Sequence, residues 1–130
     1  VARSTDGGSG WESKHKGTAT LFGLDLGANG TGFAVGQDGA VIRTADGGAT
    51  WADVNTGIKT NLLGVAVAAD GTIYATGMHE VLKGRDDGRP WAQLTAPAAQ
   101  GRWYTGLAAV PASNGVVGVG QTAQILKLGE

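Results

Sequence analysis

Short apolar stretches alternate with glycine-rich turns along the whole chain. Runs of β-branched and aromatic residues bounded by turn residues predict β-strands. No segment keeps a helical period over three turns, so no helix is expected. The first four strands are expected in LFGLDL (21–26), TGFAVGQ (31–37), AVIRTAD (40–46) and TWADV (50–54).

This four-strand plan recurs with a period of 40 residues. It returns as LLGVAV (62–67), GTIYATG (71–77), EVLKGRD (80–86) and PWAQL (90–94), and begins again as YTGLAAV (104–110), GVVGVG (115–120) and QILKL (124–128). The same step relates Val1, Val41 and Val81, Asp6, Asp46 and Asp86, Gly8, Gly48 and Gly88, and Trp11, Trp51 and Trp91.

Repeated four-stranded units of this length are typical of β-propeller blades. We therefore expect an all-β chain, a β-propeller segment of four-stranded antiparallel blades with about three blade equivalents. Residues 1–20 would end one blade, residues 21–54 and 62–94 would form full blades, and residues 103–130 would form an incomplete one.

Composition agrees with a compact chain that has many tight turns. The 130 residues are 42% hydrophobic and 16% charged, and 24 are glycine. The net charge of −1 gives no global field that would attract nucleic acid. No apolar run is long enough to predict membrane insertion, and the lack of cysteine excludes disulfides and thiolate ligands.

The repeated DGG turns have a structural explanation. An aspartate before two glycines can accept hydrogen bonds from backbone N–H groups two residues on, and glycine adopts the positive φ that tight hairpins need. The tryptophan that follows is expected to cover neighbouring strands at a seam between blades, with its indole N–H near a carbonyl.

The pattern S/T-x-D-x-G-x-T-W in these turns resembles the Asp-box, or BNR, repeat of sialidases and other β-propellers. TADGGATW (44–51) fits it fully, STDGGSGW (4–11) has Gly10 in place of threonine, and GRDDGRPW (84–91) departs at Gly84 and Pro90, so a looser third turn is expected. Residues 32–51 resemble the propellers of photosystem II stability/assembly factors still more closely. The resemblance implies structural aspartates away from any catalytic face, a scaffold role and an extracytoplasmic location.

Three blades of about 40 residues are too few to close a propeller, which usually has four to eight. Open sheet edges and uncovered blade faces associate readily. We therefore expect a section of a longer propeller, and the alternative is a homo-oligomer that closes the ring, in which two chains could supply six blades.

Two groups of side chains are candidates for binding a protein partner. A basic stripe on equivalent strand positions comprises Arg3, Arg43, Lys83 and Lys127, and its alternative is a solvated strand face. The second group lies in the variable connections between units, where specificity usually resides, and comprises Lys14, His15, Lys16, Lys59, Arg102, Trp103 and Tyr104. Trp103 and Tyr104 could equally pack beside the innermost strand.

We predict no catalytic residue, no cofactor and no metal. The arginines do not supply the set that a sialidase needs, and His15 and His79 match no metal-ligand spacing. The leading hypothesis is a non-enzymatic scaffold that binds protein. Glycan binding or a sialidase-like glycosidase fragment is the alternative, and a purely structural spacer is the third.

Overall fold

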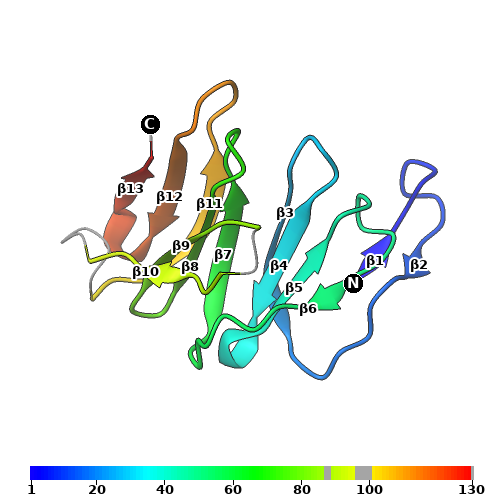
Figure 1. Cartoon of the computed structure of the whole chain (residues 1–130), viewed down its shortest axis with the longest axis horizontal. Coiled ribbons are helices and arrows are strands. Elements are labelled where there is room, and N and C mark those ends of the chain that lie inside the picture. The colour runs from blue at the N-terminus through cyan, green and yellow to red at the C-terminus, as the bar shows by residue number, and fades with distance from the viewer. Residues whose placement is uncertain (87–88, 96–100, 130) are drawn as a thin grey trace.

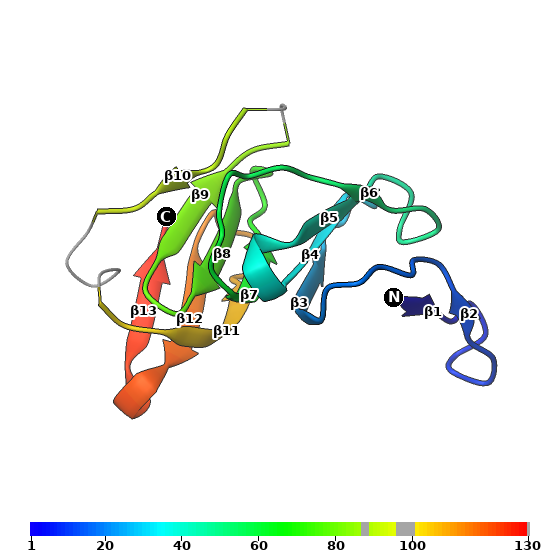
Figure 2. The same cartoon turned by 90° about the horizontal axis from the view of Figure 1, so that it is seen from below.

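The computed structural model describes residues 1–86, 89–95 and 101–129. Its strands form four antiparallel sheets that follow one another from the N-terminal to the C-terminal end (Figures 1 and 2). The sheets are β1–β2, β3–β4–β5–β6, β7–β8–β9–β10 and β11–β12–β13. The all-β prediction is confirmed, and no helix among the described residues is long and apolar enough to cross a membrane.

The first two sheets contain β1 (Ala2–Arg3), β2 (Glu12–Ser13), β3 (Leu21–Leu26), β4 (Gly32–Gly36), β5 (Val41–Thr44) and β6 (Ala52–Asp53). The last two contain β7 (Leu62–Val67), β8 (Ile73–Gly77), β9 (Val81–Gly84), β10 (Ala92–Gln93), β11 (Tyr104–Ala109), β12 (Val116–Gly120) and β13 (Ile125–Leu128). Short 3₁₀ turns, η1 (Gln37–Gly39) and η3 (Gln121–Ala123), precede β5 and β13.

The first strands of the last three sheets, β3, β7 and β11, lie side by side with β7 in the middle. Each has a register shift near its start, ending at Gly23, Gly64 and Gly106. A Cβ added to Gly23 would lie 3.1 Å from the Cα of Gly64. Glycine therefore lets the backbones of adjacent sheets approach closely at this point.

Two clusters of buried apolar side chains fill the spaces between these sheets. In the first, Phe33 and Val41 of the β3–β6 sheet meet Val65 and Trp91 of the β7–β10 sheet. The rings of Phe33 and Trp91 meet edge to face, with centroids 5.6 Å apart. Because the β7–β10 sheet packs against the β3–β6 sheet on one side and the β11–β13 sheet on the other, the core consists of seams between sheets.

The two turns that follow β1 and β5 are held by nearly identical hydrogen bonds. The backbone N–H of Thr50 donates to Asp46 Oδ1 (2.9 Å), and that of Gly48 donates to the Thr44 hydroxyl (2.9 Å). The first turn has the equivalent bonds from Gly10 to Asp6 (2.9 Å) and from Gly8 to Ser4 (2.8 Å). The aspartates thus accept from four residues on, not two as expected, because the N–H two residues after each aspartate, that of Gly8 or Gly48, donates to the Ser4 or Thr44 hydroxyl instead.

The three repeated tryptophans differ in burial. Trp11 and Trp51 donate their indole N–H to Gly8 and Gly48 of their own turns, at 3.1 and 3.2 Å. Trp91 is buried against Phe33, but Trp11 is exposed, so the expected cover over neighbouring strands is wrong for Trp11. The β1–β2 pair has no inner strands in its own sheet for Trp11 to pack on.

The departures from the pattern in the third turn have a packing reason. A Cβ at Gly84 would lie 2.2 Å from Cδ1 of Trp91, so only glycine lets this indole ring lie over β9. Asp86 accepts hydrogen bonds from Nε and Nη2 of Arg43, which belongs to the preceding sheet. The expected looser turn centres on residues 87–88, including Gly88, which lie outside the described residues.

Removing one hydroxyl should change the titration of the second turn. The Thr50 hydroxyl, the Thr50 backbone N–H and the Thr44 hydroxyl hold the pKa of Asp46 far below its ordinary value of 3.8. The resulting stabilisation is present above the unfolded-state pKa and is lost as the pH falls through the folded-state pKa. We expect Thr50→Val to raise the pKa of Asp46 towards 3.8 in a carboxyl-carbon NMR titration. Asp6 serves as the internal control, and an unchanged Asp46 would contradict the assigned cause.

Candidate functional site

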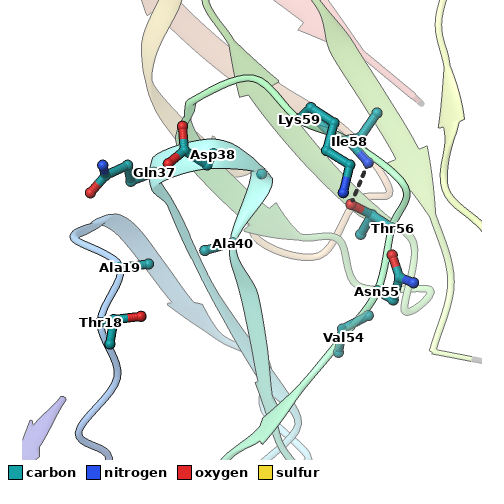
Figure 3. A pocket seen from close by; sticks show the side chains of 11 residues that line it. Thr18, Ala19, Gln37, Asp38, Ala40, Val54, Asn55, Thr56, Ile58 and Lys59 are labelled. Atoms are coloured by element: carbon teal, nitrogen blue, oxygen red, sulfur yellow. Dashed lines mark hydrogen bonds between the residues drawn. The ribbon is translucent and has the colours of Figure 1, made fainter.

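A groove lies between the segments that connect the first three sheets, at the end of the molecule where η1 is found (Figure 3). Its volume is about 380 Å³. Thr18 and Ala19 line one wall, the η1 turn the base, and the segment between β6 and β7 the other wall. We call it the connector groove, lined by Thr18, Ala19, Gln37, Asp38, Gly39, Ala40, Val54, Asn55, Thr56, Ile58 and Lys59.

The base of the connector groove is a turn tied to both walls. The backbone N–H of Gln37 donates to the Thr20 carbonyl (2.8 Å), and that of Asp38 donates to Asn61 Oδ1 (2.9 Å). Asp38 and Gly39 both have positive φ, 54° and 76°. A Cβ on Gly39 would lie 2.0 Å from the Ile58 carbonyl oxygen, so this glycine sets how closely the turn and the second wall meet.

The second wall is shaped by its own side chains. Asn55 Oδ1 accepts a hydrogen bond from the backbone N–H of Gly57 (3.0 Å), and the Thr56 hydroxyl accepts one from Ile58 (3.4 Å). Such short-range bonds fix a connecting segment without a strand partner. Lys59 follows directly and is exposed at the rim.

A smaller hollow of about 200 Å³ lies next to the connector groove, shares Thr18, Ala19 and Ala40 with it, and is also lined by His15, Lys16 and Asp53. Of the predicted contact residues, Lys59 therefore lines the connector groove, and His15 and Lys16 line the adjacent hollow. Lys16 and Lys59 are exposed, and neither takes part in the ion pairs found among the described residues. The lining is polar and of mixed charge.

Other predicted contact residues are already engaged within the chain. Lys14 pairs with Glu12, Arg43 with Asp86, and Arg102 donates to Gln124. These side chains are therefore less available to a partner than the sequence suggested.

Tyr104 is a correction: it is buried in the second core cluster, and its carbonyl accepts the Thr76 hydroxyl at 2.9 Å. Its position at the start of an innermost strand explains the burial, so the packing alternative holds for it. Trp103 is half-buried beside it.

The basic stripe is divided among separate sheets. Arg43 reaches the next sheet through Asp86, and the Arg3 side chain lies over Gly48 of its neighbouring turn. The Lys83 ammonium is 5.9 Å from the ring centroid of Tyr74, and Lys127 is exposed on β13. Arg3 and Arg43 thus lie along seams between sheets, whereas the connector groove gathers side chains from several segments around one hollow.

A second depression, of about 640 Å³, lies at the opposite ends of the inner strands, among the hairpin loops that follow β3, β7 and β11. Its lining is mostly small and apolar, with Asp25 and Asp86 as carboxylates. Asp25 accepts from the backbone N–H of Leu26 (3.0 Å) and of Val67 in the next sheet (2.8 Å). Both carboxylates therefore hold sheets together, and among the described residues no group of His, Asp or Glu could bind a metal.

Antiparallel sheets arranged side by side around adjacent first strands define a β-propeller segment. Solved β-propellers match this fold. YCF48 from Cyanidioschyzon merolae matches with a TM-score of 0.66 and 22% identity over 84% of this chain and 34% of that one. The structure of YCF48 bound to D1 peptide matches with a TM-score of 0.63 and 18% identity over 85% of this chain and 38% of that one.

This chain therefore spans just over a third of the length of these solved propellers. No protein-family model and no curated protein sequence matches it. With identities of 22% and 18%, the similarity shows the fold alone. The connector groove is the feature of this chain that bears on its function.

Several residues that shape the sites did not stand out in the sequence. Gln37, Asn55 and Thr56 line the groove, and Asn61 and Asp25 join one sheet to the next. Gln37 was predicted to end the strand over 31–37 and lies instead in the η1 turn, and nothing local signals which segment Asn61 or Asp25 would meet, 23 and 42 residues away.

Proposed function

We propose that this chain is a non-enzymatic, assembly-factor-like scaffold that binds an extended peptide segment of a protein partner in the connector groove. The observation that carries the proposal is that Lys16, Lys59 and several hydrogen-bonding side chains line two adjacent hollows, which share Thr18, Ala19 and Ala40. Mixed polar groups around a shallow hollow suit a peptide, whose backbone needs donors and acceptors along its length.

The similarity to YCF48 supports this choice of ligand. One of the matching structures is YCF48 bound to D1 peptide, so a propeller of this fold binds a peptide. The resemblance of residues 32–51 to photosystem II assembly factors points in the same direction. We therefore favour protein over glycan as the partner.

The proposed lack of catalysis rests on how the repeated aspartates are used. Asp6 and Asp46 accept hydrogen bonds within their own turns, which lower the pKa of both carboxyls. Carboxylates held in this way are poor general acids at neutral pH. We propose that residues 4–11 and 44–51 are Asp boxes with a structural role.

Charge reversal at the groove tests peptide binding. We expect the Lys16→Glu/Lys59→Glu double variant to raise the Kd for the D1 peptide about tenfold in isothermal titration calorimetry, since exposed charges contribute about 0.2–1 kcal/mol each. Lys83→Glu makes the same charge change on β9, outside the groove, and should leave the Kd unchanged.

Two results would contradict the proposal. One is an equal loss of affinity in Lys83→Glu and in the groove variant, which would indicate only a general charge effect. The other is glycan binding on an array, or release of free sugar from sialylated substrates, by a chain that binds no peptide.

A further inference from the structure

The two end faces of the row of sheets carry apolar residues whose equivalents are buried elsewhere in the repeat. On the last sheet, Val119 and Ile125 are 54% and 68% exposed. Their equivalents in the β3–β6 sheet, Val35 and Val41, are 0% and 2% exposed, because β7 of the next sheet covers them.

At the other end of the row, β3 exposes apolar residues whose equivalents on β7 form the second side of that seam. Leu24 on β3 is 51% exposed, whereas its equivalent on β7, Val65, is 3% exposed against Phe33 and Val35. Leu26 and Phe22 are also exposed on β3. Exposed apolar patches of this kind mark interaction surfaces.

The two bare faces are therefore complementary to each other, and the seam between the β3–β6 and β7–β10 sheets shows how they would fit. We propose that the face of the β11–β13 sheet of one copy, centred on Val119 and Ile125, packs against Leu24 and Leu26 on β3 of a second copy. The contact is head to tail, so two copies can close on themselves through two identical seams. This inference does not depend on peptide binding in the connector groove.

Strand content supports a second copy as the occupant. Among the described residues the β11–β13 sheet corresponds to the first three strands of the two preceding sheets, and no strand equivalent to β6 or β10 lies beside β13. β2 is a strand of that type: it pairs Glu12 with Arg3 as β6 pairs Ala52 with Arg43. Placed beside β13 of another copy in the same register, β2 would set Glu12 opposite Lys127, an attractive cross-strand pair.

β1 and β13 are both the third strand of a blade. When β2 of one copy pairs with β13 of the other, β1 therefore has to leave its place beside β2. β1 is the one expected to leave, because two residue pairs and the hydrogen bonds of Val1 with Lys14 and His15 join it to β2, whereas four residue pairs join β13 to β12. The closed pair would then contain six blades, three from each copy, within the usual range for propellers.

The test is the mass of the whole chain in solution, by light scattering over a concentration series, for the unchanged chain and three variants. We expect the unchanged chain to reach the mass of two copies. Leu24→Asp and Ile125→Asp should each raise the dimer Kd more than about tenfold, because each would bury a charge in the seam. Both sites are exposed in one copy, so circular dichroism should show an unchanged fold.

Mixing the two variants distinguishes a head-to-tail seam from any other contact. The Leu24→Asp variant keeps an intact last sheet and the Ile125→Asp variant keeps an intact β3, so an equimolar mixture should recover two-copy particles through one good seam. Met78→Asp is the matched control, since Met78 is exposed in the turn between β8 and β9 and should not affect the mass.

Three outcomes would overturn the proposal. A mass of one chain at all concentrations would mean that blades from a longer polypeptide cover these faces. Sensitivity to only one of the two aspartate variants would indicate contact between like faces. Loss of the dimer in Met78→Asp would place the contact elsewhere.

Discussion

Replacing Phe33 by alanine is expected to lower the free energy of unfolding by about 3–5 kcal/mol, as truncation of a buried aromatic ring typically does. Phe33 is buried in the seam between the β3–β6 and β7–β10 sheets, where its ring meets Trp91 edge to face. The change would leave a cavity in the first core cluster, between the two sheets. Urea unfolding followed by circular dichroism measures the loss.

Phe22→Ala is the matched control for this prediction. It removes the same ring from an exposed position on β3, and it should change the free energy of unfolding by no more than about 0.5 kcal/mol in dilute solution. Equal effects of the two changes would contradict the assignment of the first core cluster to a seam between sheets.

Gly39→Ala is expected to destabilise the chain by about 2–4 kcal/mol through two separate effects. The residue has φ of 76°, where a side chain is strained, and its Cβ would lie 2.0 Å from the Ile58 carbonyl oxygen. The turn at the base of the connector groove would have to move away from its wall. The same unfolding measurement, together with peptide affinity, would detect both consequences.

Gly57→Ala separates the two effects, because Gly57 also has φ of 76° but a Cβ added to it would have no atom within 4 Å. It should cost only about 1–2 kcal/mol, the strain of a left-handed residue. The last sheet offers a natural comparison, since Ala123 occupies the position equivalent to Gly39 with φ of 57° and is exposed. A cost of Gly39→Ala no larger than that of Gly57→Ala would show that the close contact with Ile58 is absent.

The strands and the Asp-Gly-Gly turns were predictable because they depend on residues that are close together in the sequence. Alternating apolar runs and the DGG turns place β3 to β6 and their repeats within a residue or two, and Thr44, Asp46 and Gly48 make their bonds within a few residues of each other. The repeat also predicts that equivalent positions meet equivalent neighbours. Val41 and Val81 are both buried on this basis.

Contacts between sheets were less predictable, because the sequence does not state which side chains meet across a seam. Asp86 was expected to hold its own turn, yet Gly84 offers no hydroxyl and Pro90 no N–H, and the carboxylate binds Arg43 of the preceding sheet. Tyr104 was predicted both to begin a strand and to be a contact residue of a variable connection, and it begins an innermost strand with its side chain buried. Of the connector groove and the adjacent hollow, the sequence identified only Lys59, His15 and Lys16, because both hollows depend on how the connecting segments pack together.

Adjacent sheets are expected to pack face to face as propeller blades. The most direct test is the NOE between the Phe33 ring and the Trp91 indole, in a chain with selectively labelled aromatic residues. With ring centroids 5.6 Å apart, cross-peaks between the two side chains are expected. Assigned rings that show cross-peaks only to residues of their own sheets would contradict the propeller arrangement.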